Sequence, residues 1–180
     1  MKKIILTAAL LVSLLLSGCG NAAQQRYLAY SQELSEQDSL GFTARLTAVY
    51  PDRSADFTLR YELSDGVQRV TVLEPESIRG VSARIDEGGT KLEYDAAVLD
   101  TGDLDRAGLS PMSALPLLVD ALKSGHANAF WTEEGCDVVE LLVDDVTTVR
   151  VHFDGTGRPA SAELISDGVV RVQCEIIDRS

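Results

Sequence analysis

The fold is decided by residues 40–66, which read LGFTARLTAVYPDRSADFTLRYELSDG. Apolar side chains alternate with polar ones from Leu40 to Tyr50, and the alternation returns from Phe57 to Leu63. A period of two places alternate side chains on opposite faces of a β-strand. The turn-forming sequence Pro-Asp-Arg-Ser at 51–54 joins the two segments. The stretch therefore predicts two long antiparallel strands that form a hairpin.

The alternating pattern continues along the chain on the C-terminal side of this hairpin. Further strands are expected at 67–73, 78–85, 91–95, 137–143, 147–153, 160–166 and 169–177, with turns rich in Gly and Asp between most of them. Residues 96–108 are acidic and are expected to be irregular.

Two segments have apolar residues three and four positions apart, which is typical of helices. The first spans Gln24 to Asp38. The second begins after Ser110, a suitable N-cap followed by a proline, and ends at Gly125. Pro116 interrupts it, so its first turn is expected to be kinked or separate.

About nine strands and two helices, with no strand–helix–strand alternation, predict an α+β fold built on one large antiparallel sheet. A sheet of this many strands has to curl. Its concave face then needs a cover, and only the two helices are available. The expected architecture is a half-open β-barrel covered by two helices.

The N-terminus has the features of a lipoprotein signal. Lys2 and Lys3 precede an apolar run from Ile4 to Leu16, which is too short to span a membrane. The following Leu16-Ser17-Gly18-Cys19 resembles a bacterial lipobox, in which the cysteine is acylated and becomes the first residue. We expect a signal peptide at 1–18, a lipidated tether at 19–24 and the folded domain at 25–180, anchored by acyl chains on Cys19 at the extracytoplasmic face of the cell membrane.

The composition limits the partners of this domain. Removal of Lys2 and Lys3 with the signal leaves 14 basic and 28 acidic residues, a balance of −14. Such a charge makes nucleic acid an unsuitable partner. It also repels an anionic bilayer, so the anchor is expected to bind the membrane and the domain is not.

The order of these elements resembles the superfamily of lipoprotein carriers and related envelope proteins, whose members include LolA, LolB and the germination lipoprotein GerS. The segments that most carry the resemblance are 42–46, 74–80 and 110–116. It implies a protein without catalytic activity that holds an acyl chain in its half-barrel. The alternative it implies is an interaction protein that binds and supports a cell-envelope enzyme.

Motifs for catalysis or metal binding are weak. Asp100-Thr101-Gly102 resembles the motif of aspartic proteases, whose chemistry needs two carboxylates, so a single copy would require a symmetric dimer. His126 and His152 lack metal-ligand spacing, and Asp100, Asp103 and Asp105 lack the full calcium-loop pattern. We therefore assign no catalytic residue, no metal and no cofactor.

The sequence leaves two alternatives for each of three side chains. Cys136 and Cys174 either form a disulfide or stay as two free thiols; the alternation places Cys174 on the apolar face and Cys136 on the opposite one. Trp131, expected in a loop, either contacts a partner or packs at the edge of the core.

The sequence nominates apolar residues on the two hairpin strands and the second helix as the lining of a ligand cavity. Ordinary core packing is the alternative. These residues are Phe42, Leu46, Phe57, Leu59, Tyr61, Leu115, Leu118 and Leu122.

Overall fold

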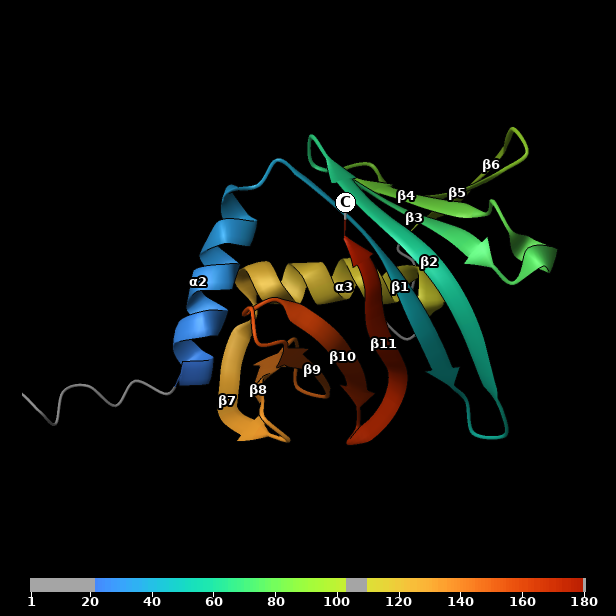
Figure 1. Ribbon diagram of the computed structural model, residues 1–180. Helices are drawn as coiled ribbons and strands as arrows, with labels where there is room; N and C mark the ends of the chain where they lie inside the picture. Colours follow the sequence, from blue (N-terminus) through green and yellow to red (C-terminus); the bar gives the residue numbers. More distant parts are fainter. Residues whose placement is uncertain (1–21, 103–109, 180) are drawn as a thin grey trace, which may run out of the picture.

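The computed structural model of the protein describes residues 22–102 and 110–179 (Figure 1). The helices are α2 (Ala22–Glu36) and α3 (Pro111–Ser124), with a short 3-10 turn at Glu76–Ile78. The strands are β1 (Ser39–Val49), β2 (Ser54–Ser64), β3 (Val67–Glu74), β4 (Ser82–Asp86), β5 (Gly89–Tyr94), β6 (Ala97–Gly102), β7 (His126–Glu133), β8 (Cys136–Leu142), β9 (Thr147–Phe153), β10 (Pro159–Ser166) and β11 (Val169–Arg179).

All of these strands form one antiparallel sheet in the order β6-β5-β4-β3-β2-β1-β11-β10-β9-β8-β7. Consecutive strands are neighbours in the sheet, except for β6 and β7, which lie at its two ends, and at the centre the first strand, β1, pairs with the last, β11. The sheet curves around the helices, and its end strands β6 and β7 do not meet (Figure 1). The expected α+β class with a large curved sheet is therefore confirmed.

The predicted hairpin is confirmed in detail. Strands β1 and β2 pair without a register shift from Ser39 opposite Ser64 to Val49 opposite Ser54. Inward-facing Leu46 and Leu59 have no exposed surface, because they lie beneath the helices on the concave face. The alternation read from the sequence thus corresponds to the buried and exposed faces of the sheet.

The strand count of about nine was too low, because the sheet has eleven. Strand β6 occupies residues expected to be irregular, and β7 occupies residues expected to form a loop. In β7 the adjacent Phe130 and Trp131 contact opposite faces of the sheet: Phe130 lies against Tyr27 of α2, and Trp131 lies under Arg150 of β9. Two neighbouring aromatic residues break the apolar alternation that identifies a strand.

Helix α2 packs against β7, β8 and α3 on the concave side. Its residues Tyr27 and Leu34 are buried, as the expected apolar stripe requires. The Tyr27 hydroxyl donates to the carbonyl oxygen of Gly125 at 3.3 Å, and Arg26 forms an ion pair of 2.6 Å with the buried Asp137. The first contact holds α2 against the end of α3, and the second holds it against β8.

Helix α3 begins and ends where the sequence predicts. The Ser110 hydroxyl accepts a hydrogen bond from the Ser113 backbone, and Pro111 occupies the first helical position. Pro116 lies inside one continuous helix rather than separating a first turn. Glycine is required at position 125, because a Cβ there would come within 2.2 Å of the Ala121 carbonyl oxygen.

Several expectations lie outside the described residues. These are the signal peptide, the lipidated Cys19 and the first half of the expected tether, together with Asp103 and Asp105 of the incomplete calcium pattern. Residues 22–24, the second half of the expected tether, belong to α2. Within residues 22–102 and 110–179, none of the helices has the length and apolar character needed to cross a membrane.

Candidate functional site

A pocket of about 400 Å³ opens where both helices meet the central strands of the sheet. Helix α2 and the turn between β9 and β10 contribute to it, as do the start of β1, the middle of α3 and the end of β11. Its lining residues are Tyr30, Gln37, Ser39, Leu40, Gly41, Phe42, Leu118, Val119, Leu122, Arg158, Pro159, Ile176 and Arg179. The pocket forms because β1, the first strand, pairs with β11, the last, so that residues from both strands line the same space.

The floor of the pocket is apolar. Phe42 of β1 stacks on Tyr61 of β2, with ring centroids 5.0 Å apart. Leu118 and Leu122, one turn apart on α3, face the same space and are almost fully buried in the core. These three lining residues are fixed by packing, so the floor is formed before any ligand arrives.

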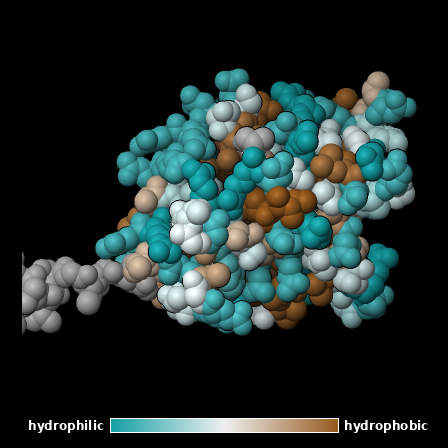
Figure 2. Space-filling model, in the orientation of Figure 1, coloured by the Kyte–Doolittle hydropathy of each residue, from teal (hydrophilic) through white to brown (hydrophobic). Residues whose placement is uncertain are grey.

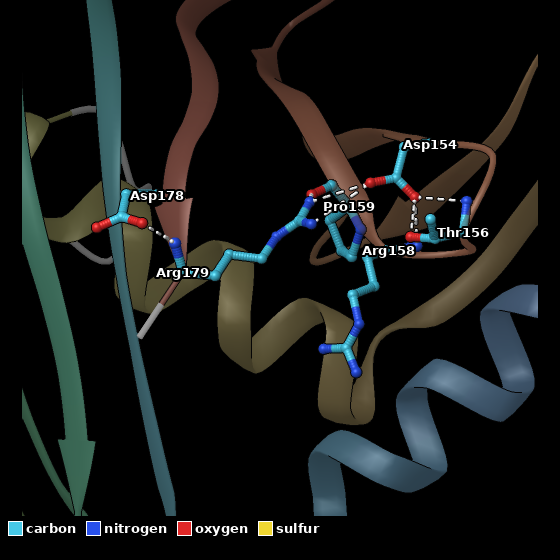
Figure 3. Close-up of polar contacts among 6 residues, drawn as sticks. All are labelled: Asp154, Thr156, Arg158, Pro159, Asp178 and Arg179. Carbon is cyan, nitrogen blue, oxygen red and sulfur yellow. Dashed lines mark hydrogen bonds and ion pairs between the residues drawn. The ribbon is translucent and has the colours of Figure 1, made fainter.

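The rim carries the only charged side chains among the described residues that line the pocket, Arg158 and Arg179. Arg158 points from the β9–β10 turn toward α2, where its Nη2 atom lies 3.0 Å from Oε1 of Glu33 (Figure 3). Arg179 reaches from β11 toward Asp154, with its Nη1 atom 3.4 Å from the carboxylate, and it also donates to the carbonyl oxygen of Pro159 (Figure 3). Two cations thus stand over an apolar floor.

Asp154 holds the β9–β10 turn in shape. Its Oδ1 atom accepts hydrogen bonds from the backbone N–H groups of Thr156 and Arg158 and from the Thr156 hydroxyl. Slight burial acts to raise the pKa of Asp154, but these bonds and the charge of Arg179 outweigh it and lower the pKa to about 2. The turn therefore presents Arg158 in a fixed position.

Tyr30 stands at the same rim. Its ring packs edge-on against Phe153, with centroids 5.9 Å apart. Burial raises the pKa of the Tyr30 hydroxyl, while the positive charges of Arg158 and Arg179 act to lower it. Tyr30, Arg158 and Arg179 thus line one pocket and supply its polar part, together with Gln37 and Ser39.

The structure brings together only part of the predicted lining. Phe42, Leu118 and Leu122 line the pocket. Four other nominated residues have no exposed surface and lie in the filled core, and Phe57 is half-buried and packs against it. These four core residues are Leu46, Leu59, Tyr61 and Leu115.

Sequence reasoning missed the polar rim. Tyr30 belongs to the apolar stripe recognised in the first helix, so its spacing could have identified it. Arg158 lies in a turn and Arg179 near the C-terminus, and neither position has a local signal. They reach the pocket only through the pairing of β1 with β11.

The remaining singled-out residues lie away from the pocket. Cys136 and Cys174 are free thiols, with two strands between them, and burial raises the pKa of Cys174 to about 12, as does the charge of Glu175 to a smaller extent. Trp131 lies in strand β7 rather than in a loop, half-exposed, and its indole N–H donates to Glu133.

Asp100 lies exposed on strand β6, in register with Lys91 of β5. The second carboxylate that protease chemistry needs would have to come from another copy of the chain. In the part of the chain that the structure describes, no three His, Cys, Asp or Glu side chains are arranged to hold a metal ion.

No family model matches the sequence, and no curated protein matches it. Among solved structures, the chain is similar to an uncharacterized conserved protein from Thermus thermophilus, at 10% identity over 87% of this chain and 86% of that one, with a TM-score of 0.52. It is also similar to a LolA superfamily protein from Nitrosomonas europaea, at 18% identity over 89% and 92% of the two chains, with a TM-score of 0.44.

A third similar chain comes from the structure of the CwlD amidase from Clostridioides difficile in complex with the GerS lipoprotein, at 12% identity over 87% and 94% of the two chains, with a TM-score of 0.45. At these identities the likeness concerns the fold alone.

Proposed function

We propose that the protein is a non-catalytic, lipid-anchored envelope protein whose half-barrel binds an acyl chain or another apolar ligand. The observation that carries this proposal is the pocket of about 400 Å³ on the concave face, with its floor of Phe42, Leu118 and Leu122. Small-molecule sites occupy about 300–1,000 Å³ and are mostly apolar with a few polar groups. The pocket has this size, and its lining combines an apolar floor with polar groups at the rim.

The position of the pocket suits a chain-like ligand. It lies beside the filled core, between elements fixed by separate contacts, so a ligand can bind without separating the sheet from α3. The face shown in Figure 2 is mostly hydrophilic, with separate hydrophobic patches.

The direct test uses the chain from Gly20 onward, purified without detergent. A thermal melt verifies that this purified protein is folded. This chain retains every helix and strand described here. We expect mass spectrometry of the extracted protein to find a co-purifying acyl lipid, or the emptied protein to bind one when it is added. Absence of both results would contradict the proposal.

The anchor belongs to the same proposal. Acylation of Cys19 after removal of residues 1–18 would place the domain at the extracytoplasmic face of the cell membrane, with the tether as its only link. We expect Cys19→Ser to abolish the lipid mass on the mature protein. Unchanged acylation in this variant would contradict the assignment.

A second candidate function is docking on an envelope protein, and the position of Trp131 favours it. Strand β7 is last in the sheet order, so one of its edges has no strand neighbour among residues 22–102 and 110–179, and the half-exposed Trp131 belongs to this strand. Exposed aromatic residues on an edge strand suit protein recognition. A pull-down from native envelopes in which Trp131→Ala loses a partner that the parent chain retains would support this function.

A further inference from the structure

The charges at the pocket contrast with those of the whole domain. The chain has 28 acidic and 16 basic side chains, yet both charged residues that line the pocket, within the described ranges, are arginines. The carboxylates nearest to them, Glu33 and Asp154, pair with the guanidinium groups but do not line the pocket themselves. The cationic groups are therefore the ones presented to a ligand.

The two arginines retain hydrogen-bonding capacity for a ligand. A guanidinium carries five N–H donors in a planar fork and stays charged at all accessible pH values. Arg158 contacts Glu33 through Nη2, one of its two terminal nitrogens. Arg179 donates through Nη2 to the carbonyl oxygen of Pro159, whereas both its separations from Asp154 are 3.4 Å, longer than a strong charge-assisted bond. An incoming anion can therefore bind the remaining donors or replace a weakly held carboxylate.

The pocket lining brings together the two kinds of surroundings that an amphiphile needs. Tyr30 lines the same pocket as the two arginines and adds a neutral hydroxyl to its polar part. Leu118 and Leu122 of α3 contribute to its apolar part. A head bound at the rim would leave its chain on the apolar floor.

We infer that the pocket selects an amphiphile with one acyl chain and an anionic oxygen head, a carboxylate or a phosphate, which Arg158 and Arg179 bind. This inference rests on the proposed function, because it requires the pocket to be the acyl site. It adds the chemical class of the head, which the apolar floor alone does not define.

The test compares lauroyl probes on the chain from Gly20 onward, each used below its micelle concentration. Laurate carries a carboxylate, lauroyl lysophosphatidate carries a phosphate, and monolauroylglycerol is neutral. We expect at least one anionic probe to bind about tenfold more tightly than the neutral one, as charge-assisted hydrogen bonds predict. The anionic probe that binds more tightly shows whether the pocket prefers a carboxylate head or a phosphate head.

The variants Arg158→Gln and Arg179→Gln remove the charge and retain a polar side chain. Each should weaken binding of the preferred anionic probe several-fold and weaken monolauroylglycerol binding by a smaller factor. Arg45→Gln is the matched control, because Arg45 pairs with Glu175 at 3.0 Å without lining the pocket, and it should change neither affinity. Thermal melts of all three variants verify that they are folded.

Three results would overturn the inference. Equal affinity for all three lauroyl probes would show an acyl site without head selection, which leaves the proposed function intact. Binding of inorganic phosphate as tight as that of lysophosphatidate would show an anion site that ignores the chain. Failure of every lauroyl probe to bind would reject the proposed function and the inference together.

Discussion

Arg158 and Glu33, 125 positions apart in the sequence, form an ion pair of 3.0 Å that joins the β9–β10 turn to helix α2 at the rim of the pocket. Both side chains are about half exposed, so the pair contributes no more than about 1 kcal/mol to stability. Its importance lies in its position. Glu33 holds the guanidinium that an anionic ligand would also contact.

We expect Glu33→Gln to lower the free energy of unfolding by less than about 1 kcal/mol and to tighten laurate binding a few-fold. The reason is that Arg158 loses its anionic competitor. Glu36→Gln, one turn away and outside the pocket, is the control, because Glu36 accepts a hydrogen bond from Gln32 and should not affect binding. A weaker laurate affinity in Glu33→Gln would contradict the role given to Arg158.

Asp154 should give the domain a specific response to acid. Its pKa of about 2 in the folded protein lies below the ordinary value of about 3.9. The stability it contributes is therefore fully present above about pH 4 and is lost as the pH falls toward 2. We expect Asp154→Asn to cost about 1 kcal/mol at neutral pH, since the carboxylate is partly exposed, and progressively less below pH 4.

Denaturant unfolding of the parent chain and Asp154→Asn, repeated between pH 2 and 7, measures this difference. Other carboxylates titrate in both proteins and cancel in the comparison. A difference in the free energy of unfolding that stays constant across this range would show that the hydrogen bonds to Asp154 do not depend on its charge.

Arg26 should stabilise the packing of α2. Its partner Asp137 has a side chain only 7% exposed, whereas that of Arg26 is 45% exposed. Removal of the cation leaves a buried carboxylate without its ion-pair partner, so we expect Arg26→Ala to cost about 2 kcal/mol in unfolding experiments. Addition of Asp137→Asn should recover part of this loss, and a strictly additive double variant would contradict the coupling.

The two cysteines of the domain should differ in reactivity. Cys174 is buried with a pKa of about 12, whereas Cys136 is partly exposed at the start of β8. Because the thiolate is the reactive species, iodoacetamide at pH 8 should label Cys136 in the folded protein and Cys174 only after unfolding. Peptide mass spectrometry measures both sites. If neither cysteine of the unfolded protein reacts until a reductant is added, the two cysteines form a disulfide and are not free thiols.

Local patterns predicted the strands and helices whose side chains alternate or form stripes. The hairpin of β1 and β2 followed from strict alternation between Leu40 and Leu63, and the cap and end of α3 followed from Ser110 and Gly125. Strand β6 was missed because its Val98 and Leu99 are both exposed, so it lacks the apolar alternation of a half-buried strand.

The pocket was predicted only in part, and the reason is physical. Periodicity identifies which face of an element is buried, but not how completely neighbouring side chains fill the space above it. Phe42 and Leu46 lie on the same face of β1, yet only Phe42 lines the pocket. Arg179 joins the site through pairing between the first and last strands, which leaves no local trace in the sequence.

The most direct test of an acyl-binding pocket is to fill it. Ile176 of β11 is half-buried and lines the pocket, whereas its neighbour Ile177 is 45% exposed and lies outside it. Ile176→Trp should occupy the space of an acyl chain, and Ile177→Trp is the matched control. The neutral probe monolauroylglycerol makes the test independent of the charge of the head.

The measurement is the dissociation constant of monolauroylglycerol for the parent chain and the two tryptophan variants, each verified as folded by its thermal melt. Our account predicts that Ile176→Trp weakens binding by at least about tenfold, since a filled pocket excludes the chain, and that Ile177→Trp leaves it unchanged. Undiminished binding to a folded Ile176→Trp, or no binding to the parent chain, would contradict it.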